Sequence, residues 1–109
     1  MLNIEAMKAL CEPSRCRILM LLSQRAYCVS ALATLLNIST PAASQHLRIL
    51  RDAGLVTCEK YGYHTHYLPQ QEAVDYLADQ FEKMRIASLR VDRDMTQCQC
   101  EYRKENQEK

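Results

Sequence analysis

The chain has 109 residues, of which 48% are apolar, and its formal net charge is +1 at pH 7. This length fits one domain with a modest core, to which a subunit interface would add buried surface. Since the net charge is close to zero, the composition excludes a uniformly basic protein that coats nucleic acid, and any DNA site must be a local patch.

Apolar runs and cysteine spacing limit the class of protein further. The longest apolar run, from Ile18 to Leu22, is too short to cross a bilayer, and no signal peptide is recognisable at the start. We therefore expect a cytoplasmic protein without a membrane partner, whose six cysteines are mostly reduced. No cysteine pair has the C-x-x-C spacing of zinc ribbons and thiol oxidoreductases. Because neither a nucleophile–base arrangement nor a βαβ unit is visible, we do not expect an enzyme.

Helical spacing of apolar residues predicts three helices in the first third of the chain. The first is short, and its apolar residues are Leu2, Ile4, Met7 and Leu10. Pro13 starts the second, whose many apolar residues from Cys16 to Leu22 predict a central, well-buried helix. Ser30 is expected to cap the third. The apolar stripe of this third helix consists of Leu32, Leu35 and Leu36.

The segment from Ile38 to Val56 predicts a fourth helix, suited to a DNA groove. Ser39 is a good N-cap, and Pro41 falls in the first turn, where its missing N–H costs nothing. Gly54 is expected to end the helix in the left-handed conformation. One side carries a stripe for the core, formed by Ala43, Leu47 and Leu50. Because this helix follows the third after a short turn at residues 37–38, the pair predicts a helix-turn-helix.

After Gly54 the apolar pattern changes from helical to strand-like. Residues 55–60 and 63–68 are rich in β-branched and aromatic side chains, and they flank Tyr61 and Gly62. This pattern predicts a β-hairpin with its turn at these two residues. A hairpin that follows a helix-turn-helix forms a wing.

From Glu72 the chain returns to helical spacing, with a seam made by Val74, Leu77, Phe81, Met84, Ser88 and Val91. We expect this seam to pack on the same helix of a second subunit, with the N-terminal helix beside it; packing on the chain's own core is the alternative. The predicted fold is mainly α with a small β-hairpin wing: a winged helix-turn-helix, homodimeric through the N- and C-terminal helices. Residues 1–93 form the DNA-binding and dimerisation domain, and residues 94–109 form a charged, cysteine-containing tail that is partly disordered.

Two segments carry a resemblance to a known family. The run from Ala9 to Leu19 is similar to the family's A-L-x-[DE]-P-x-R-x-x-I-L opening, and the run from Ser39 to Val56 is similar to its recognition helix. Over residues 5–92 the chain thus resembles the ArsR/SmtB family of small winged-helix repressors. The resemblance implies a homodimer that binds palindromic operator DNA and releases it when a metal, a metalloid or an oxidant acts on its thiols.

The resemblance also indicates which residues would contact DNA, with two recognition helices in successive major grooves about 34 Å apart. Gln45 is the best candidate for reading a base, since its amide can form two hydrogen bonds with adenine. Arg48 is expected to neutralise phosphate, as is Arg51 unless it forms a structural ion pair. His46 is expected to be mainly structural. The predicted DNA-binding set is Ser39, Thr40, Ala42, Ser44, Gln45 and Arg48 on the helix, with Lys60, Tyr63 and His64 on the wing.

The metal sites of the family fit this chain poorly. The E-L-C-V-C-D-L motif of arsenic and cadmium sensors aligns with residues 26–32, where Cys28 matches its first thiol and Ser30 replaces the second. No histidine follows His66, so the zinc and nickel site of the terminal helix is absent. A cadmium- and lead-sensing branch is similar at residues 14–19 and 91–98. The recognition-helix cysteines of that branch are replaced by Ile49 and Ala53.

Geometry ranks the remaining thiols. Cys98 and Cys100 face the same side only if the chain is extended there, and Cys11 and Cys16 flank the Pro13 turn, where they are free to approach each other. Three thiolates suit As(III) or Pb(II), and four suit Cd(II) or Zn(II), as the inducer; DNA binding itself requires no cofactor. We predict a three- or four-thiolate site from Cys11, Cys16, Cys98 and Cys100, with Cys28 and Cys58 less favoured.

Three alternatives stay open. The same cysteines could form a disulfide or a polysulfide, which would make the protein a redox- or persulfide-sensing repressor. Cys16 could be a buried, inert thiol, because it occupies a position that is often leucine. The winged helix could also bind protein and never DNA, which predicts no salt-dependent binding to a promoter fragment.

Overall fold

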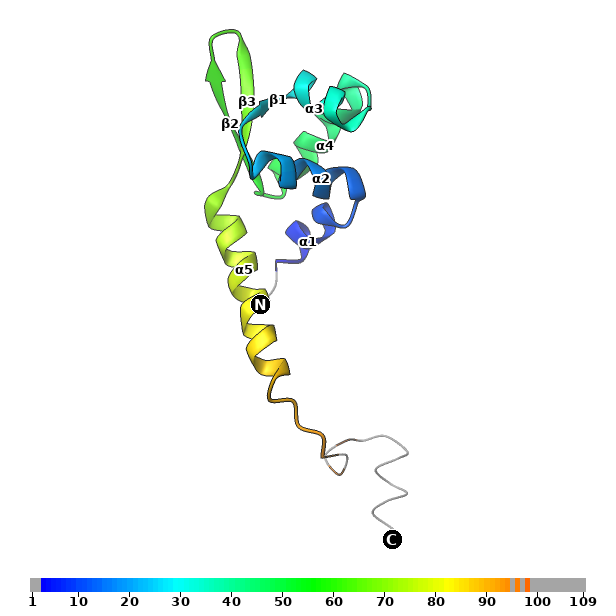
Figure 1. Cartoon of the computed structure of the whole chain (residues 1–109), viewed down its shortest axis with the longest axis vertical. Coiled ribbons are helices and arrows are strands. Elements are labelled where there is room, and N and C mark those ends of the chain that lie inside the picture. Colours follow the sequence, from blue (N-terminus) through cyan, green and yellow to red (C-terminus); the bar gives the residue numbers. More distant parts are fainter. Residues whose placement is uncertain (1–2, 95, 97, 99–109) are drawn as a thin grey trace.

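The computed structural model describes residues 3–94, 96 and 98 of the chain. Figure 1 shows that α1 to α4 form one body, that the β2–β3 hairpin extends from one end of it, and that α5 leaves it at the other. Within the described part of the chain, no helix is long and apolar enough to cross a membrane. The elements are α1 (Ile4–Leu10), α2 (Pro13–Leu22), β1 (Tyr27–Cys28), α3 (Val29–Leu36), α4 (Thr40–Asp52), β2 (Val56–Tyr61), β3 (His64–Pro69) and α5 (Gln71–Ser88).

One apolar core joins the helices of the body to the base of the sheet. Burial of a large aliphatic side chain contributes roughly 1.5–3 kcal/mol, so this cluster is what holds α4 on the body. The stripe expected on α4 is confirmed, since Ala43, Leu47 and Leu50 are all buried. The largest fully buried side chains are Ile18, Leu32, Leu47, Leu50 and Leu55.

The first two helices are placed as expected but bury different residues. In α1 it is Ala6 and Ala9 that are buried, whereas Ile4 is 56% exposed, because small side chains let α1 lie close to α2 and α4. Leu2 lies outside the described residues. The expectation that α2 is well buried is wrong for this subunit, since α2 buries only Ile18 and Leu22 and leaves Met20 64% exposed.

The third helix begins earlier than expected. Cys28, not Ser30, is its N-cap, because Cys28 is extended and paired with His66 of β3, and the helix starts directly after that pairing. The buried residues of α3 are Leu32, Ala33 and Leu36. The expected burial of Leu35 is therefore wrong, and its side chain is 50% exposed.

The sheet has three antiparallel strands in the order β1-β3-β2. The sequence pattern predicts β2 and β3 but not β1, which is only two residues long. The expected turn at Tyr61 and Gly62 is shifted by one residue, since Tyr61 still pairs with His64. The turn is Gly62–Tyr63, with Gly62 at φ 64°, which fits the type II′ pattern of glycine at the first turn position.

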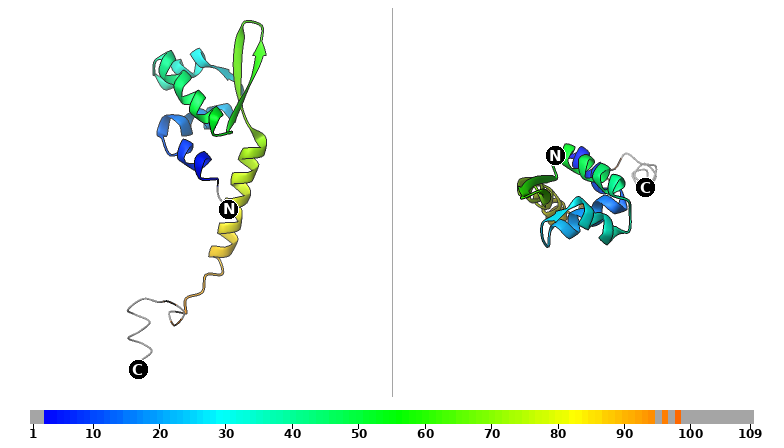
Figure 2. Two further views of the ribbon diagram at one scale, coloured as in Figure 1. Left: turned by 180° about the vertical axis from the view of Figure 1, so that it is seen from behind. Right: turned by 90° about the horizontal axis from the view of Figure 1, so that it is seen from above.

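The last helix leaves the body after a short contact. Figure 2 shows in its left view that α5 lies beside the body only over its first turns and then continues beyond it. Leu77 is its one buried residue among those described, while Phe81 and Met84 are 47% and 46% exposed. The helix ends at Ser88, so the expected continuation to Val91 is wrong. The seam is thus covered by the subunit's own core at Leu77 but not at Phe81 and Met84.

Candidate nucleic-acid interface and thiol groups

The exposed side of α4 is a row of short polar side chains above a buried stripe. Ser39 caps the helix as expected, since its Oγ accepts a hydrogen bond of 3.2 Å from the N–H of Ala42. Pro41 occupies the first turn. At the other end, Gly54 (φ 78°) donates to Arg51 O and Leu55 donates to Leu50 O, which is the Schellman arrangement. Both ends of the helix are therefore fixed by local residues.

The helix residues of the predicted DNA-binding set lie together on this row. Thr40, Ser44, Gln45 and Arg48 are exposed, while Ala42 is half-buried beside them. A shallow hollow follows the helix here, lined by Pro41, Ser44, Gln45, Arg48, Ile49 and Asp52. Arg51 is also exposed and forms no ion pair with any described residue, which disfavours the alternative of a structural pair.

The wing residues of the predicted set do not share a face. Cross-strand partners lie on the same side of a sheet, and side chains alternate along each strand. Lys60 pairs with Thr65, whereas His64 pairs with Tyr61 on the opposite side. Tyr67 shares the Lys60 face, and it lines a second hollow together with Ser44, Leu47, Arg48, Arg51 and Asp52 of α4. Lys60 is therefore on the α4 side, Tyr63 is fully exposed at the tip, and His64 is on the outer side.

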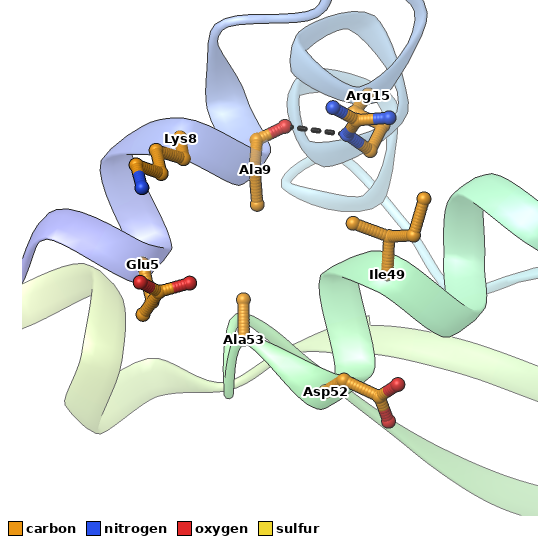
Figure 3. Close-up of a pocket in the computed structure, with 7 residues that line it drawn as sticks. All are labelled: Glu5, Lys8, Ala9, Arg15, Ile49, Asp52 and Ala53. Atoms are coloured by element: carbon orange, nitrogen blue, oxygen red, sulfur yellow. Dashed lines mark hydrogen bonds between the residues drawn. The ribbon is translucent and has the colours of Figure 1, made fainter.

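His46 joins α4 to the corner between α1 and α2. Its Nδ1 lies 3.5 Å from Nη1 of Arg15 and 3.8 Å from Oε2 of Glu12. Arg15 also donates from Nε to the carbonyl of Ala9, at 2.7 Å. Figure 3 shows this bond at the edge of a pocket between α1 and α4. These contacts agree with the expectation that His46 is mainly structural.

Glu12 is the N-cap of α2 and the anionic member of this corner. Its Oε2 accepts a 2.9 Å hydrogen bond from the N–H of Arg15. This bond holds the pKa of the Glu12 carboxyl below its ordinary value, and the charges of His46 and Arg15 act in the same direction. Sequence reasoning identified neither the Glu12 cap nor the Arg15–His46 contact. The only available signal was the glutamate directly before Pro13, which is a typical capping position.

The predicted thiols are not assembled into one site. Cys11 and Cys16 are both exposed, so the expectation that Cys16 could be buried is wrong for this subunit. Cys98 is exposed as well, whereas Cys100 and most of the predicted tail lie outside the described residues. All five described cysteines are free. Among the described residues, no three His, Cys, Asp or Glu side chains stand close enough to hold a metal ion.

Cys28 has the most distinctive surroundings of the described thiols. Cys28 is the N-cap residue of α3, and its Sγ lies 3.3 Å from Oγ of Ser30. The Ser30 hydroxyl, followed by the backbone N–H of Ala31, holds the pKa of the Cys28 thiol below its ordinary value. Cys58 is half-buried on the wing, opposite Tyr67. Cys28 and Cys58 are distant in sequence from Cys11 and Cys16, and neither is one of the four cysteines predicted as ligands.

Comparison with known proteins identifies the family. The sequence profile of the arsR family of bacterial regulatory proteins matches residues 5–57. The chain is 35% identical over 91 residues to the uncharacterized HTH-type transcriptional regulator YbzH of Bacillus subtilis, a match that covers 70% of this chain and 91% of that one. It is 40% identical over 68 residues to the arsenical resistance operon repressor of Escherichia coli, covering 62% of this chain and 58% of that one.

Solved structures confirm the winged helix-turn-helix fold. A possible transcriptional regulator for arsenical resistance has a TM-score of 0.66 at 30% identity, with 81% of this chain and 98% of that one covered. A homodimeric winged helix-turn-helix DNA-binding domain from Mycobacterium bovis has a TM-score of 0.61 at 29% identity, with 78% and 76% covered. These relatives are regulators, so the prediction that the chain is not an enzyme is confirmed as well. The chain belongs to the arsR family of bacterial transcriptional regulators.

Proposed function

We propose that this protein is a dimeric repressor that places α4 in the major groove of a palindromic operator. The observation that carries this proposal is the exposed row of Ser44, Gln45 and Arg48 on a helix that is capped at both ends and held by a buried stripe. Short polar side chains at these positions suit base edges, and Arg48 suits phosphate. Because Lys60 lies on the α4 side of the wing, it is the wing cation that belongs with this surface.

The dimer brings two such helices together through α5. Phe81 and Met84 lie on the seam of a helix that projects from its own subunit, and helices in proteins are stabilised mainly by tertiary packing of their apolar face. A second α5, with α1 beside it, would cover this apolar surface. The homodimeric neighbour from Mycobacterium bovis supports this arrangement.

We further propose that binding of a soft ion to cysteine thiolates releases the DNA. The proposed ligands are Cys11, Cys16, Cys98 and Cys100, from one subunit or from two, and the proposed inducers are As(III), Cd(II) or Pb(II), with Zn(II) as a borderline case. Exposure of Cys11, Cys16 and Cys98 supports this choice, since an ion can reach all three. The name of the similar Escherichia coli protein, an arsenical resistance operon repressor, supports a metalloid inducer.

A second candidate keeps the DNA-binding function and replaces the ion by an oxidant. Exposed thiols that flank one turn, such as Cys11 and Cys16, also suit a disulfide or a polysulfide bridge. The two candidates differ in stoichiometry. Binding of an ion destroys no thiols, so all of them can be titrated once a chelator has removed the ion. Oxidation removes two thiols from each subunit without any metal.

The proposal is tested with the reduced protein and a duplex taken from the DNA directly upstream of its own coding sequence. We expect binding that weakens steeply with salt, and release by a soft ion together with a thiolate absorption band. The matched control is the Cys98→Ser, Cys100→Ser double variant, which should bind the duplex normally but respond less to the ion. Unchanged release in this variant would remove the tail from the site, and no duplex binding by the unmodified protein would refute the repressor function.

A further inference from the structure

We infer that Arg15 and His46 are positioning residues, which set the orientation of the DNA-reading helix against the α1–α2 corner. The inference rests on the proposed DNA-binding function. It assigns no DNA contact to either residue. The helix α4 has the orientation that fits the DNA groove only while the Arg15 guanidinium contacts both α1 and α4.

The Arg15 guanidinium contacts two helices. Its Nε donates to the carbonyl of Ala9 at 2.7 Å, and its Nη1 lies 3.5 Å from Nδ1 of His46. Ala9 lies in the last turn of α1, where carbonyl groups have no partner within the helix. One planar group therefore joins the end of α1 to the middle of α4. Lysine cannot reproduce this two-point geometry, because its ammonium is a single point charge.

Two charged side chains face Nδ1 of His46. A guanidinium has donors and no acceptor, so Nη1 of Arg15 can act only as a donor in its 3.5 Å contact with Nδ1 of His46. The Glu12 carboxylate also faces Nδ1, at 3.8 Å. The arginine and the glutamate thus face the same ring nitrogen, and the arginine is the nearer of the two.

The α1–α2 corner adjoins two of the proposed thiol ligands. Cys11 is the C-cap of α1, two residues after Ala9, and Cys16 directly follows Arg15. The N–H of Cys16 donates to the carbonyl of Glu12, at 3.0 Å. A ligand that draws Cys11 and Cys16 together therefore acts on the segment that holds His46. The Arg15–His46 contact therefore lies between the proposed inducer site and the DNA-reading helix.

The test compares substitutions that break the link with substitutions that keep it. Arg15→Lys and His46→Ala remove it, whereas His46→Asn keeps an acceptor close to the position of Nδ1. Arg17→Lys is the matched control, because it makes the same change in the same helix, and the Arg17 guanidinium has no hydrogen bond or ion pair with any described residue. Binding is measured on the upstream duplex and on a scrambled duplex of the same length, over a range of salt concentrations.

We expect Arg15→Lys and His46→Ala to lower the ratio of specific to non-specific affinity about tenfold, the size typical of one lost charge-assisted hydrogen bond. The salt dependence should stay unchanged, and His46→Asn and Arg17→Lys should behave like the unmodified protein. An unchanged ratio in both link variants would overturn the inference. A salt slope reduced by about one in Arg15→Lys would also overturn it, because Arg15 would then be a phosphate contact.

A second measurement separates failure of this inference from failure of the proposed function. Amide hydrogen exchange over α4 needs no DNA and no ion. If the link positions α4, exchange of the α4 amides is faster in His46→Ala than in His46→Asn, while exchange in α3 stays the same. Equal exchange in the two variants would refute the link even if the protein proved to bind no DNA at all.

Discussion

Cys28 and His66 lie directly opposite each other where β1 pairs with β3. Because α3 starts at the next residue, this pairing ties the beginning of the helix-turn-helix to the base of the wing. Cys28 is thus a thiol at the junction of the helix-turn-helix and the wing.

The acidity of the Cys28 thiol should depend on Ser30. The Ser30 hydroxyl is the largest cause of the lowered pKa of Cys28, so Ser30→Ala should raise that pKa. Since the thiolate is the reacting form, the pH at which iodoacetamide modifies Cys28 at half its maximal rate should move upward. Mass spectrometry of the Cys28 peptide measures this shift. Thr34→Ala is the control, since Thr34 bonds the carbonyl of Ser30 and not the thiol. Equal profiles in Ser30→Ala and the unmodified protein would contradict the prediction.

The N-cap of α4 should contribute measurably to stability. Ser39→Ala removes the hydrogen bond from the N–H of Ala42, and we expect the free energy of unfolding to fall by about 1 kcal/mol. Ser39→Asn restores a capping group and should recover most of the loss. Urea unfolding at one protein concentration measures both changes, because the stability of a dimer depends on concentration. A loss of the same size in Ser39→Asn would show that the serine acts in another way.

Arg48 should act on DNA as a phosphate contact. Arg48→Ala is expected to weaken binding to all duplexes and to reduce the slope of log affinity against log salt by about one. Lys83→Ala removes a cation from α5, where Lys83 Nζ lies 3.2 Å from Asp79, and it should leave the slope unchanged. If both variants reduced the slope equally, net charge rather than the α4 surface would govern binding.

Phe81 should be part of the subunit interface. Phe81→Glu places a carboxylate in the apolar seam of α5, and its desolvation on pairing is unfavourable. We expect monomers in sedimentation velocity at concentrations where the unmodified protein and Lys83→Ala are dimers. A dimeric Phe81→Glu variant with normal DNA binding would show that another surface joins the subunits.

The elements that could be predicted from the sequence are those fixed by local signals. Ser39, Pro41 and Gly54 mark the ends of α4, and its buried stripe follows from helical spacing alone. The hairpin was predictable for the same reason. Its exact turn residues were not, because Gly62 can adopt its positive φ at either position of a two-residue turn. The polar row of α4 follows directly from the placement of this helix.

The features that could not be predicted depend on contacts between distant residues. β1 is two residues long and exists only because β3 pairs with it, and that pairing moves the start of α3 from the expected Ser30 cap to Cys28. Arg15 and His46 are 31 positions apart, and no local pattern relates them. In the same way, the burial of Ala33 and the exposure of Leu35 depend on how α3 packs on α4.

The measurement that tests the central claim most directly is an ion titration of the reduced protein bound to its upstream duplex. As(III), Cd(II), Pb(II) and Zn(II) are added separately, and DNA release is read by fluorescence anisotropy while thiolate absorption is read in the ultraviolet. We predict that a soft ion releases the DNA at one equivalent per site, with a matching absorption band. Absence of release by every ion, with release on treatment with a disulfide-forming oxidant, would contradict the ion-sensing mechanism and favour the oxidative switch.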